Sequence, residues 1–280
     1  MVVDNKATVS YIRVLKEDLA IFHVKPNEGQ ISDFKPGQFV TLGLNVPNEG
    51  KVIRRAYSIA SPPEQKKYFE LIVRWVKKPL PGRLTTQLFD KKEGEEINWV
   101  KPTGIFTINE KMPDGSPDDR RLVLVGGGTG LAPFISYSLH LKSKGTKRQI
   151  IVLHGASYVD ELSYREILTE LEEESLEKGS NEWNFRYRAS ISRPQEWFNR
   201  SWNGHKGRVE TFLRPKPGKD KSPLEELAGE KITPQNTSFY VCGWQGTVDG
   251  VLDSLVPKGF VTERNKRKDG TFDVKFESYG

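Results

Sequence analysis

The chain has 280 residues, of which 36% are hydrophobic, and its 43 Lys and Arg against 37 Asp and Glu give a formal net charge of +6. This length predicts two domains, the hydrophobic content excludes a disordered or fibrous chain, and so mild a positive charge does not by itself imply a nucleic-acid partner. The single cysteine, Cys242, excludes an internal disulfide, a four-cysteine zinc site and a cysteine-bound iron–sulfur cluster within this chain.

The first hundred residues consist of short β-prone runs separated by turn signals such as Pro-Asn-Glu-Gly and Lys-Pro-Gly. Strands at this spacing, without helices between them, predict an antiparallel barrel or sandwich. The expected strands are residues 7–14, 19–24, 38–44, 55–60, 68–76 and 96–100, and residues 84–89 form a short helix-compatible segment. Residues 111–119, with two prolines, one glycine and four charges, then mark a linker.

The second half of the chain alternates between apolar strands and helices, which predicts a parallel, doubly wound sheet. Strands are expected at residues 122–125, 149–154, 185–191 and 238–241, and helices at residues 131–144, 162–177 and 247–255. Ser163 and Glu166 are spaced as a capping box for the second of these helices. Residues 214–235, rich in Pro, Lys and Glu, are interpreted as a surface insertion. The predicted domains are residues 1–112 and residues 120–280.

The most informative segment is the run Gly-Gly-Gly-Thr-Gly-Leu-Ala-Pro at residues 126–133, directly after an apolar strand. Glycines allow the backbone to approach a ligand closely, and the start of the following helix is a ready site for phosphate. The run departs from the G-x-G-x-x-G fingerprint, because Leu131 or Pro133 stands at the last glycine position, and it lacks the Gly-Lys-Ser/Thr of an NTPase loop. It therefore predicts a phosphate-binding turn, with a glycine-rich turn without a ligand as the alternative.

Three other segments carry residue types that bind or react with ligands. Residues 54–61 alternate a cation, an aromatic and a hydroxyl along a strand, although taken alone they fit an ordinary barrel strand better. Cys242-Gly243 ends an apolar strand at the edge where open α/β sheets bind ligands, but most free cysteines are simply buried. The chain ends in Phe-Glu-Ser-Tyr-Gly, which brings an acid and an aromatic to a terminus that is otherwise expected to fray.

Arg-x-Tyr-Ser, Gly-Gly-Gly-Thr-Gly-x-x-Pro, Cys-Gly and a terminal Glu-x-Tyr, in this order, resemble the bacterial branch of the ferredoxin–NADP+ reductase family over essentially the whole chain. The resemblance implies an N-terminal antiparallel β-barrel that binds FAD and a C-terminal α/β Rossmann-like domain with a parallel sheet that binds NADP(H). It also implies an enzyme that transfers hydride between NADP(H) and flavin and single electrons to or from ferredoxin or flavodoxin.

The resemblance also assigns roles by position. It implies that Arg55 binds the FAD pyrophosphate, that Tyr57 stacks on the flavin, that Ser58 lies near its reactive N5 atom and that Tyr279 covers the other flavin face. The further FAD-binding residues that it implies are Ala56, Leu84, Thr85 and Thr86. The implied NADP-binding residues are Gly128, Thr129, Gly130, Pro133, Ser192, Arg193, Arg208, Cys242 and Gly243. The implied catalytic residues are Ser58, Cys242, Glu277 and Tyr279, of which Cys242 and Glu277 line the nicotinamide pocket.

Two positions depart from the family's pattern. Ser157 stands where bacterial relatives often carry an arginine, although the strand before it also lacks an immediate carboxylate for a ribose diol. Because Ser192, Arg193 and Arg208 remain to bind a 2′-phosphate, we expect NADP rather than NAD. Gly280 stands where relatives have an aromatic that stacks on the FAD adenine, so the adenine is held elsewhere or the flavin binds less tightly.

The family's acidic partners make the basic run at residues 263–268 a candidate surface for docking ferredoxin or flavodoxin, although such runs are as often plain solvated surface. The four histidines, His154 among them, show no metal-ligand spacing. We expect a cytoplasmic monomer without a signal peptide, membrane span, metal site or nucleic-acid partner. The alternatives are an NADH-dependent cytochrome or oxygenase reductase on the same scaffold and a non-enzymatic basic binding protein. Ser58 and the Glu277-Ser278-Tyr279 ending favour the ferredoxin–NADP+ reductase over the first of these.

Overall fold

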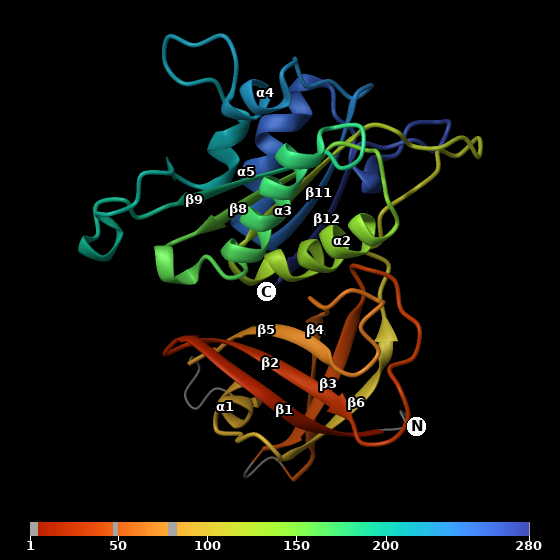
Figure 1. Ribbon diagram of the computed structural model, residues 1–280, viewed down its shortest axis with the longest axis vertical. Coiled ribbons are helices and arrows are strands. Elements are labelled where there is room, and N and C mark those ends of the chain that lie inside the picture. The colour runs from red at the N-terminus through yellow and green to blue at the C-terminus, as the bar shows by residue number, and fades with distance from the viewer. Residues whose placement is uncertain (1–4, 47–49, 78–82, 280) are drawn as a thin grey trace. The chain divides into compact units, whose positions relative to one another are not determined.

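The computed structural model describes residues 5–46, 50–77 and 83–279 (Figure 1). The chain forms two compact units, residues 1–107 with 132–140, and residues 108–131 with 141–280. The predicted two-domain architecture, with an antiparallel sheet in one unit and a parallel sheet in the other, is confirmed. The domain limits at residues 112 and 120 stay predictions.

The first unit is built on a six-stranded antiparallel sheet in the order β4-β3-β6-β1-β2-β5. Its strands are β1 (Asn5–Lys16), β2 (Leu19–Pro26), β3 (Phe39–Asn45), β4 (Val52–Ser58), β5 (Phe69–Arg74) and β6 (Glu96–Thr103). The two edge strands, β4 and β5, also contact each other, and the Ala60 backbone N–H donates to the Glu70 carbonyl at 2.8 Å just beyond β4. The sheet therefore curls round on itself as a barrel. Apolar residues that alternate along the strands fill it, among them Phe22, Leu42 and Phe69.

Helix α1 (Leu84–Phe89) forms where the sequence predicts it and packs on this barrel. Leu84 and Leu88, four residues apart, share one face and are both buried. Phe89 meets Phe22 edge-on, with ring centroids 5.6 Å apart, and stacks on Trp75 at 5.7 Å. These contacts hold the end of the helix, at Phe89, against the barrel and beside Trp75, the residue that follows β5.

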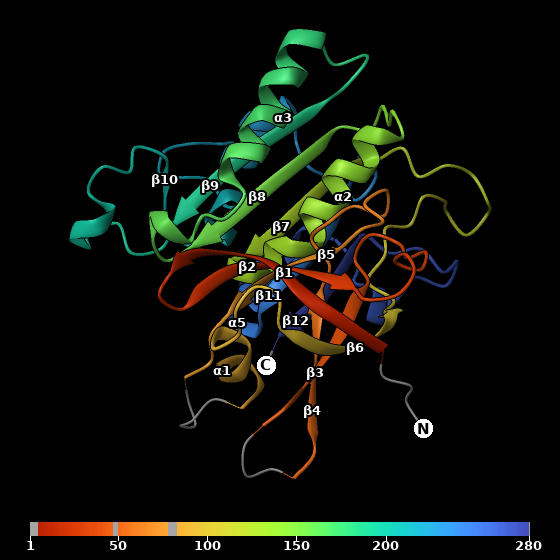
Figure 2. The same ribbon diagram turned by 60° about the horizontal axis from the view of Figure 1, so that its bottom comes forward.

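The second unit is built on a six-stranded parallel sheet in the order β10-β9-β8-β7-β11-β12. Its strands are β7 (Arg121–Gly127), β8 (Ile150–Ala156), β9 (Phe185–Ile191), β10 (His205–Lys206), β11 (Thr237–Trp244) and β12 (Val274–Tyr279). Helix α3 (Arg165–Lys178) covers one face and α5 (Gln245–Leu255) the other (Figure 2). The order of the strands reverses between β7 and β11, which makes their carboxyl ends the expected ligand-binding edge.

A short 3₁₀ turn (Gly128–Leu131) separates β7 from α2 (Ala132–Ser143), so the glycine run leads into its helix through this turn. Residues 274–279 pair in parallel with β11, so this segment is a sheet strand and is not frayed. Within the part of the chain that the structure describes, no helix is both long and apolar enough to cross a lipid bilayer.

The capping box predicted for Ser163 and Glu166 is wrong. Helix α3 begins at Arg165, after Tyr164 in a left-handed conformation (φ 57°), and this N-cap residue makes no side-chain capping bond. A capping box is instead present at α4 (Pro223–Ala228), where Ser222 Oγ accepts from the Glu225 backbone N–H. The Glu225 carboxylate accepts in return from the Ser222 backbone N–H at 2.8 Å.

The interpretation of residues 214–235 as a surface insertion is correct only for their first part. Residues 214–221 are exposed. Leu224 and Ile232, in contrast, belong to the core cluster that packs between the sheet and α5. Buried apolar side chains therefore tie this segment to the parallel-sheet unit.

Candidate functional site

Strand β4 carries the residues that the sequence assigns to FAD. It lies at an edge of the sheet, where its register pairs Tyr57 with Val40 and Ser58 with Phe39. Tyr57 packs against the barrel core, whereas Arg55 and Ala56 are exposed. The Arg55 Nη1 donates to the carbonyl of the preceding residue at 2.8 Å. The strand thus presents an exposed cation beside a largely buried aromatic ring.

The hydroxyl of Tyr57 is the feature of this unit that best fits a bound cofactor. It is buried and has no hydrogen-bond partner among the described residues. Burial raises the pKa of Tyr57 above its ordinary value, against the opposing effect of the Arg55 charge. Leaving a buried hydroxyl unpaired costs about 1–3 kcal/mol. A polar group of FAD at this position would supply the missing partner.

The threonines at the start of α1 are already engaged within the unit. Thr85 Oγ1 accepts from the Val76 backbone N–H at 3.1 Å, and Thr86 Oγ1 accepts from Trp75 Nε1 at 2.9 Å. The Leu84 side chain is buried in the core. A pyrophosphate bound here would therefore contact the backbone N–H groups of the first turn and not the threonine hydroxyls.

In the parallel-sheet unit, the structure brings several predicted residues together at the carboxyl ends of three strands. The register pairs Cys242 on β11 with Gly126 on β7 and with Glu277 on β12. The three residues therefore lie in one row across the sheet. Two positions further along, Trp244 on β11 pairs with Tyr279 on β12. This row lies at the reversal of strand order, where open α/β sheets bind their ligands.

The glycines at the end of β7 and in the turn that follows it serve two purposes. A Cβ at Gly130 would lie 2.2 Å from the Cys242 carbonyl oxygen, and one at Gly127 would lie 2.9 Å from Thr247 Oγ1, so these glycines allow the turn to pack closely. Gly128 differs, because it has φ +56° and nothing lies within 4 Å of where its Cβ would be. Gly128 therefore leaves open space just before Thr129 and α2. This space fits a phosphate of a pyridine nucleotide.

At the carboxyl edge of β11 and β12, Cys242 is buried and Glu277 and Tyr279 are half-buried, and burial favours the uncharged form of both Cys242 and Glu277. Cys242 is fully buried, and its Sγ donates to the Tyr279 hydroxyl at 3.1 Å. Burial raises the pKa of the Cys242 thiol well above its usual range, while the hydrogen bond with Tyr279 acts in the opposite direction. Burial also raises the pKa of Glu277. Cys242 is therefore a neutral hydrogen-bond donor in this arrangement, not an activated nucleophile.

His154 is a member of the same row that the sequence analysis considered only as a metal ligand. It lies near the end of β8, pairs with Gly126, and is fully buried. Burial lowers the pKa of His154 to about 3, with the Gly128 backbone opposing this, so the imidazole is neutral. Its Nδ1 lies 3.4 Å from the Tyr187 hydroxyl. A neutral imidazole thus lies beneath the glycine turn.

The residues predicted to bind the 2′-phosphate lie on loops after β9 and β10. The two strands pair at Ile191 and Lys206, which brings Ser192 and Arg193 to the same edge of the sheet as Arg208. Both arginines are exposed, but each is held by a side chain that the sequence analysis missed. Arg193 Nη1 donates to the Tyr158 hydroxyl at 2.8 Å, and Arg208 Nε donates to Glu210 Oε1 at 2.6 Å.

Gly280, the departure expected to affect adenine binding, lies outside the described residues.

The basic run 263–268 uses most of its cations within its own unit. Arg264 lies over the Phe276 ring, Lys266 over the Phe272 ring, and Arg267 pairs with Asp273 at 2.5 Å.

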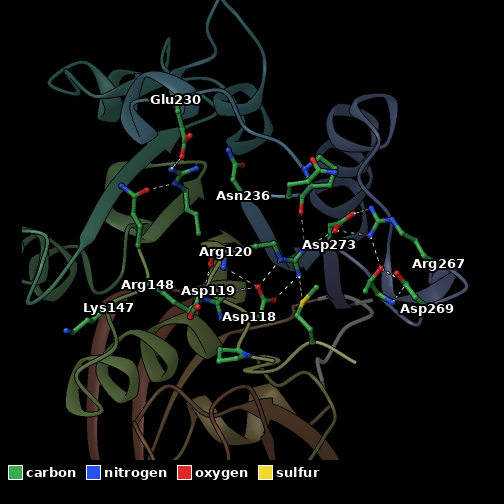
Figure 3. A pocket seen from close by; sticks show the side chains of 17 residues that line it. Asp118, Asp119, Arg120, Lys147, Arg148, Glu230, Asn236, Arg267, Asp269 and Asp273 are labelled. Carbon is green, nitrogen blue, oxygen red and sulfur yellow. Dashed lines mark hydrogen bonds and ion pairs between the residues drawn. The ribbon is translucent and has the colours of Figure 1, made fainter. Parts of the chain in front are cut away.

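A cavity of about 820 Å³ lies at the opposite edge of the parallel sheet, where β7, β8 and β11 begin (Figure 3). Most of its charged side chains are paired with one another. Arg120 donates to both Asp118 oxygens, at 2.9 and 2.8 Å, and to Asp273 Oδ1 at 2.8 Å, and Arg121 pairs with Glu230 at 2.6 Å. None of the residues predicted to bind FAD or NADP(H) lines this cavity. We interpret it as a structural ion network that secures the strand beginnings.

Comparison with known proteins follows the same division of the chain. Residues 6–108 match the family of the oxidoreductase FAD-binding domain, and residues 124–252 match that of the oxidoreductase NAD-binding domain. The protein is therefore an oxidoreductase with an FAD-binding and an NAD(P)-binding domain. It is 30% identical over 239 residues to a ferredoxin–NADP reductase of Azotobacter vinelandii, an alignment that covers 84% of this chain and 83% of that relative. The chain belongs to the ferredoxin–NADP reductase family.

The chain is also similar to proteins that are not named as ferredoxin–NADP reductases. The chain is 25% identical over 227 residues to a flavohemoprotein of Halalkalibacterium halodurans, an alignment that covers 79% of this chain but only 49% of that relative. Among solved structures, a ferredoxin NADP+ reductase from Neisseria gonorrhoeae with bound FAD and NADP superposes with a TM-score of 0.76 at 22% identity, covering 98% of both chains. A likeness at that identity shows the fold. The cofactor expectation is confirmed as an FAD-binding and an NAD(P)-binding domain.

Proposed function

We propose that the protein is a ferredoxin- or flavodoxin–NADP+ reductase. The row formed by Gly126, Cys242 and Glu277 at the reversal of strand order, beside the open position at Gly128, is the observation that carries the proposal. When bound, FAD supplies the redox chemistry, because it exchanges electron pairs with nicotinamide and single electrons with a small carrier. The roles of the site residues and the limits of the two domains, as predicted from the sequence, are part of this proposal.

The barrel unit offers residues to hold FAD. The exposed Arg55 guanidinium suits the pyrophosphate, and the backbone at the start of α1 offers further donors. The buried Tyr57 hydroxyl gains a partner when the cofactor is bound. Ser58, at the end of β4, is the residue that we propose lies at the reactive edge of the flavin.

The parallel-sheet unit offers a neutral pocket for nicotinamide. The Cys242 thiol stays protonated and donates a hydrogen bond, and burial raises the pKa of Glu277, so this acid holds its proton to a higher pH than a free glutamate. Tyr279 is hydrogen-bonded to Cys242, so a nicotinamide ring at Cys242 must displace this tyrosine. These groups orient the nicotinamide ring, which is uncharged in the reduced nucleotide, together with its carboxamide, and exclude water from the reacting atoms.

Arg193 and Arg208 support NADP(H) as the nucleotide, because both guanidinium groups are exposed at the same edge of the sheet. A second candidate function is an NADH-dependent reductase. Two observations favour it, since Ser157 supplies no cation and Glu210 neutralises part of the Arg208 charge. Steady-state kcat/KM for NADPH and NADH decides between them, and equal or better use of NADH would overturn the choice of NADP(H).

The electron carrier is tested separately. We propose an acidic ferredoxin or flavodoxin as the partner and a cytoplasmic monomer as the working form. Heat release of the flavin followed by chromatography should give FAD and not FMN. The holoprotein with NADPH should then reduce ferredoxin or flavodoxin. A protein that carries FAD and oxidises NADPH but reduces neither carrier would refute the proposed partner and leave the cofactors standing.

A further inference from the structure

The two arginines proposed for the 2′-phosphate are held by partners of different charge. Arg193 bonds to the neutral Tyr158 hydroxyl, and its guanidinium also lies over the Tyr158 ring at 5.3 Å. Arg208 bonds to the Glu210 carboxylate at 2.6 Å. Arg193 therefore keeps its full positive charge, whereas the charge of Arg208 is opposed by an acid two residues away.

Glu210 is built into the unit and is not a mobile surface acid. Its side chain is only 9% exposed, and a Cβ at Gly250 would lie 2.9 Å from its carboxyl carbon. Gly246, one turn earlier on α5, accepts from Arg208 Nη2 at 2.8 Å through its carbonyl. The Arg208–Glu210 pair thus lies along a strip of α5 that two glycines leave bare. Burial limits the screening of the Glu210 charge by solvent and salt.

The contacts of Arg208 also limit what it can offer a ligand. A guanidinium has five N–H donors. Glu210 takes the Nε donor and the Gly246 carbonyl takes one Nη2 donor, so at most three remain. The second carboxylate oxygen of Glu210, Oε2, is buried without a hydrogen-bond partner among the described residues. The only cation that the structure pairs with Glu210, among these residues, is therefore the one proposed to bind the phosphate.

We propose that Glu210 is a specificity-determining residue that limits the preference for NADP(H) over NAD(H). Its carboxylate cancels much of the Arg208 charge at the distance of a bound phosphate, which leaves Arg193 as the main net cation for the 2′-phosphate. The inference rests on the proposed function, because it assumes that the 2′-phosphate binds at these arginines. A purely structural Glu210, which only packs its loop onto α5, would have no such effect on the choice of nucleotide.

The test uses the FAD-loaded protein and its Glu210→Gln variant. Glutamine keeps the size of the side chain and an oxygen that accepts from Arg208 Nε, and removes only the charge. Binding of 2′,5′-ADP and of AMP is measured by calorimetry at low and high salt, with thermal unfolding as a check of folding. Glu210→Asn, a shorter neutral side chain, carries the same expectation if Glu210→Gln does not fold.

We expect 2′,5′-ADP to bind about 3- to 10-fold more tightly to Glu210→Gln, AMP to bind unchanged, and the gain to shrink at high salt. The matched control is Glu230→Gln, which removes the carboxylate partner of Arg121 at the other edge of the sheet. This variant should leave the affinity for both ligands unchanged. A gain of less than 2-fold, or an equal gain for AMP, overturns the inference.

Arg193→Ala separates failure of the inference from failure of the proposed function. If this variant weakens 2′,5′-ADP but not AMP while Glu210→Gln has no effect, the phosphate site stands and only the role of Glu210 is refuted. If neither Arg193→Ala nor Arg208→Ala affects 2′,5′-ADP, the phosphate does not bind at this edge and both proposals fail together.

Discussion

Replacing Gly130 by alanine should destabilise the parallel-sheet unit strongly. The new Cβ would lie 2.2 Å from the Cys242 carbonyl oxygen and 2.8 Å from the Gly243 Cα, both of them backbone atoms that no rotamer change can move. Overpacking of this kind costs typically 1–3 kcal/mol, and we expect about 3 kcal/mol here. For a unit of this size, that lowers the midpoint of thermal unfolding by roughly 6–12 °C.

Gly128→Ala is the matched control, because it lies two residues away in the same turn. Its Cβ meets nothing within 4 Å, so only the left-handed φ of +56° is penalised, at about 1–2 kcal/mol. Differential scanning calorimetry of both variants should rank Gly130→Ala as the less stable. The added methyl at Gly128 should also weaken the binding of NADP+, and the loss in binding free energy should exceed the loss in the free energy of unfolding. A Gly130→Ala protein as stable as the wild type would refute the close packing of the turn on β11.

Three further predictions concern other parts of the molecule. Tyr279→Ser should relax the discrimination between NADPH and NADH, because the less favoured nucleotide then has no ring to displace, and an unchanged ratio of kcat/KM values would count against this role. Asp273→Asn should lower the free energy of unfolding in urea by about 1.5–3 kcal/mol, because it removes the buried carboxylate that Arg120 and Arg267 share and leaves Arg120 with Asp118 alone, and a loss below 1 kcal/mol would contradict a structural ion network. Cys242 should resist iodoacetamide at pH 8, because burial raises its pKa and the thiolate forms only above the usual range. Labelling at the rate of a free thiol would show that the thiol is accessible.

Local patterns predicted the regular elements well where apolar residues repeat at one period. Strand β9 and helix α1 begin and end at the residues expected, 185–191 and 84–89. Strand β12 was missed, because Lys275 and Glu277 interrupt its apolar pattern and its strand conformation depends on pairing with β11. The capping-box motif at Ser163 failed although its spacing was right, since the chain enters α3 through the left-handed Tyr164.

The sequence predicted individual residues of the candidate site, but not the strand pairing that places them side by side. Sequence placed Cys242 at the end of a strand and Glu277 near the end of the chain, and only strand pairing shows that both lie in one row with Gly126. The partner of Arg193 is 35 residues away, which no local pattern reveals. Glu210 was within reach, because an acid two residues after a proposed phosphate-binding arginine is visible in the sequence alone.

The distribution of charge along the carboxyl edge of the parallel sheet follows the chemistry of a pyridine nucleotide. Around Cys242 and His154, burial favours the uncharged forms, which suits a nicotinamide ring. At the ends of β9 and β10, Arg193 and Arg208 stay exposed and charged, which suits phosphate. At the amino edge of the same sheet, Arg120 is instead paired with two buried acids, Asp118 and Asp273. The difference between the two edges therefore lies in how the cations are paired, and this is why the charge of Glu210 bears on the choice of nucleotide.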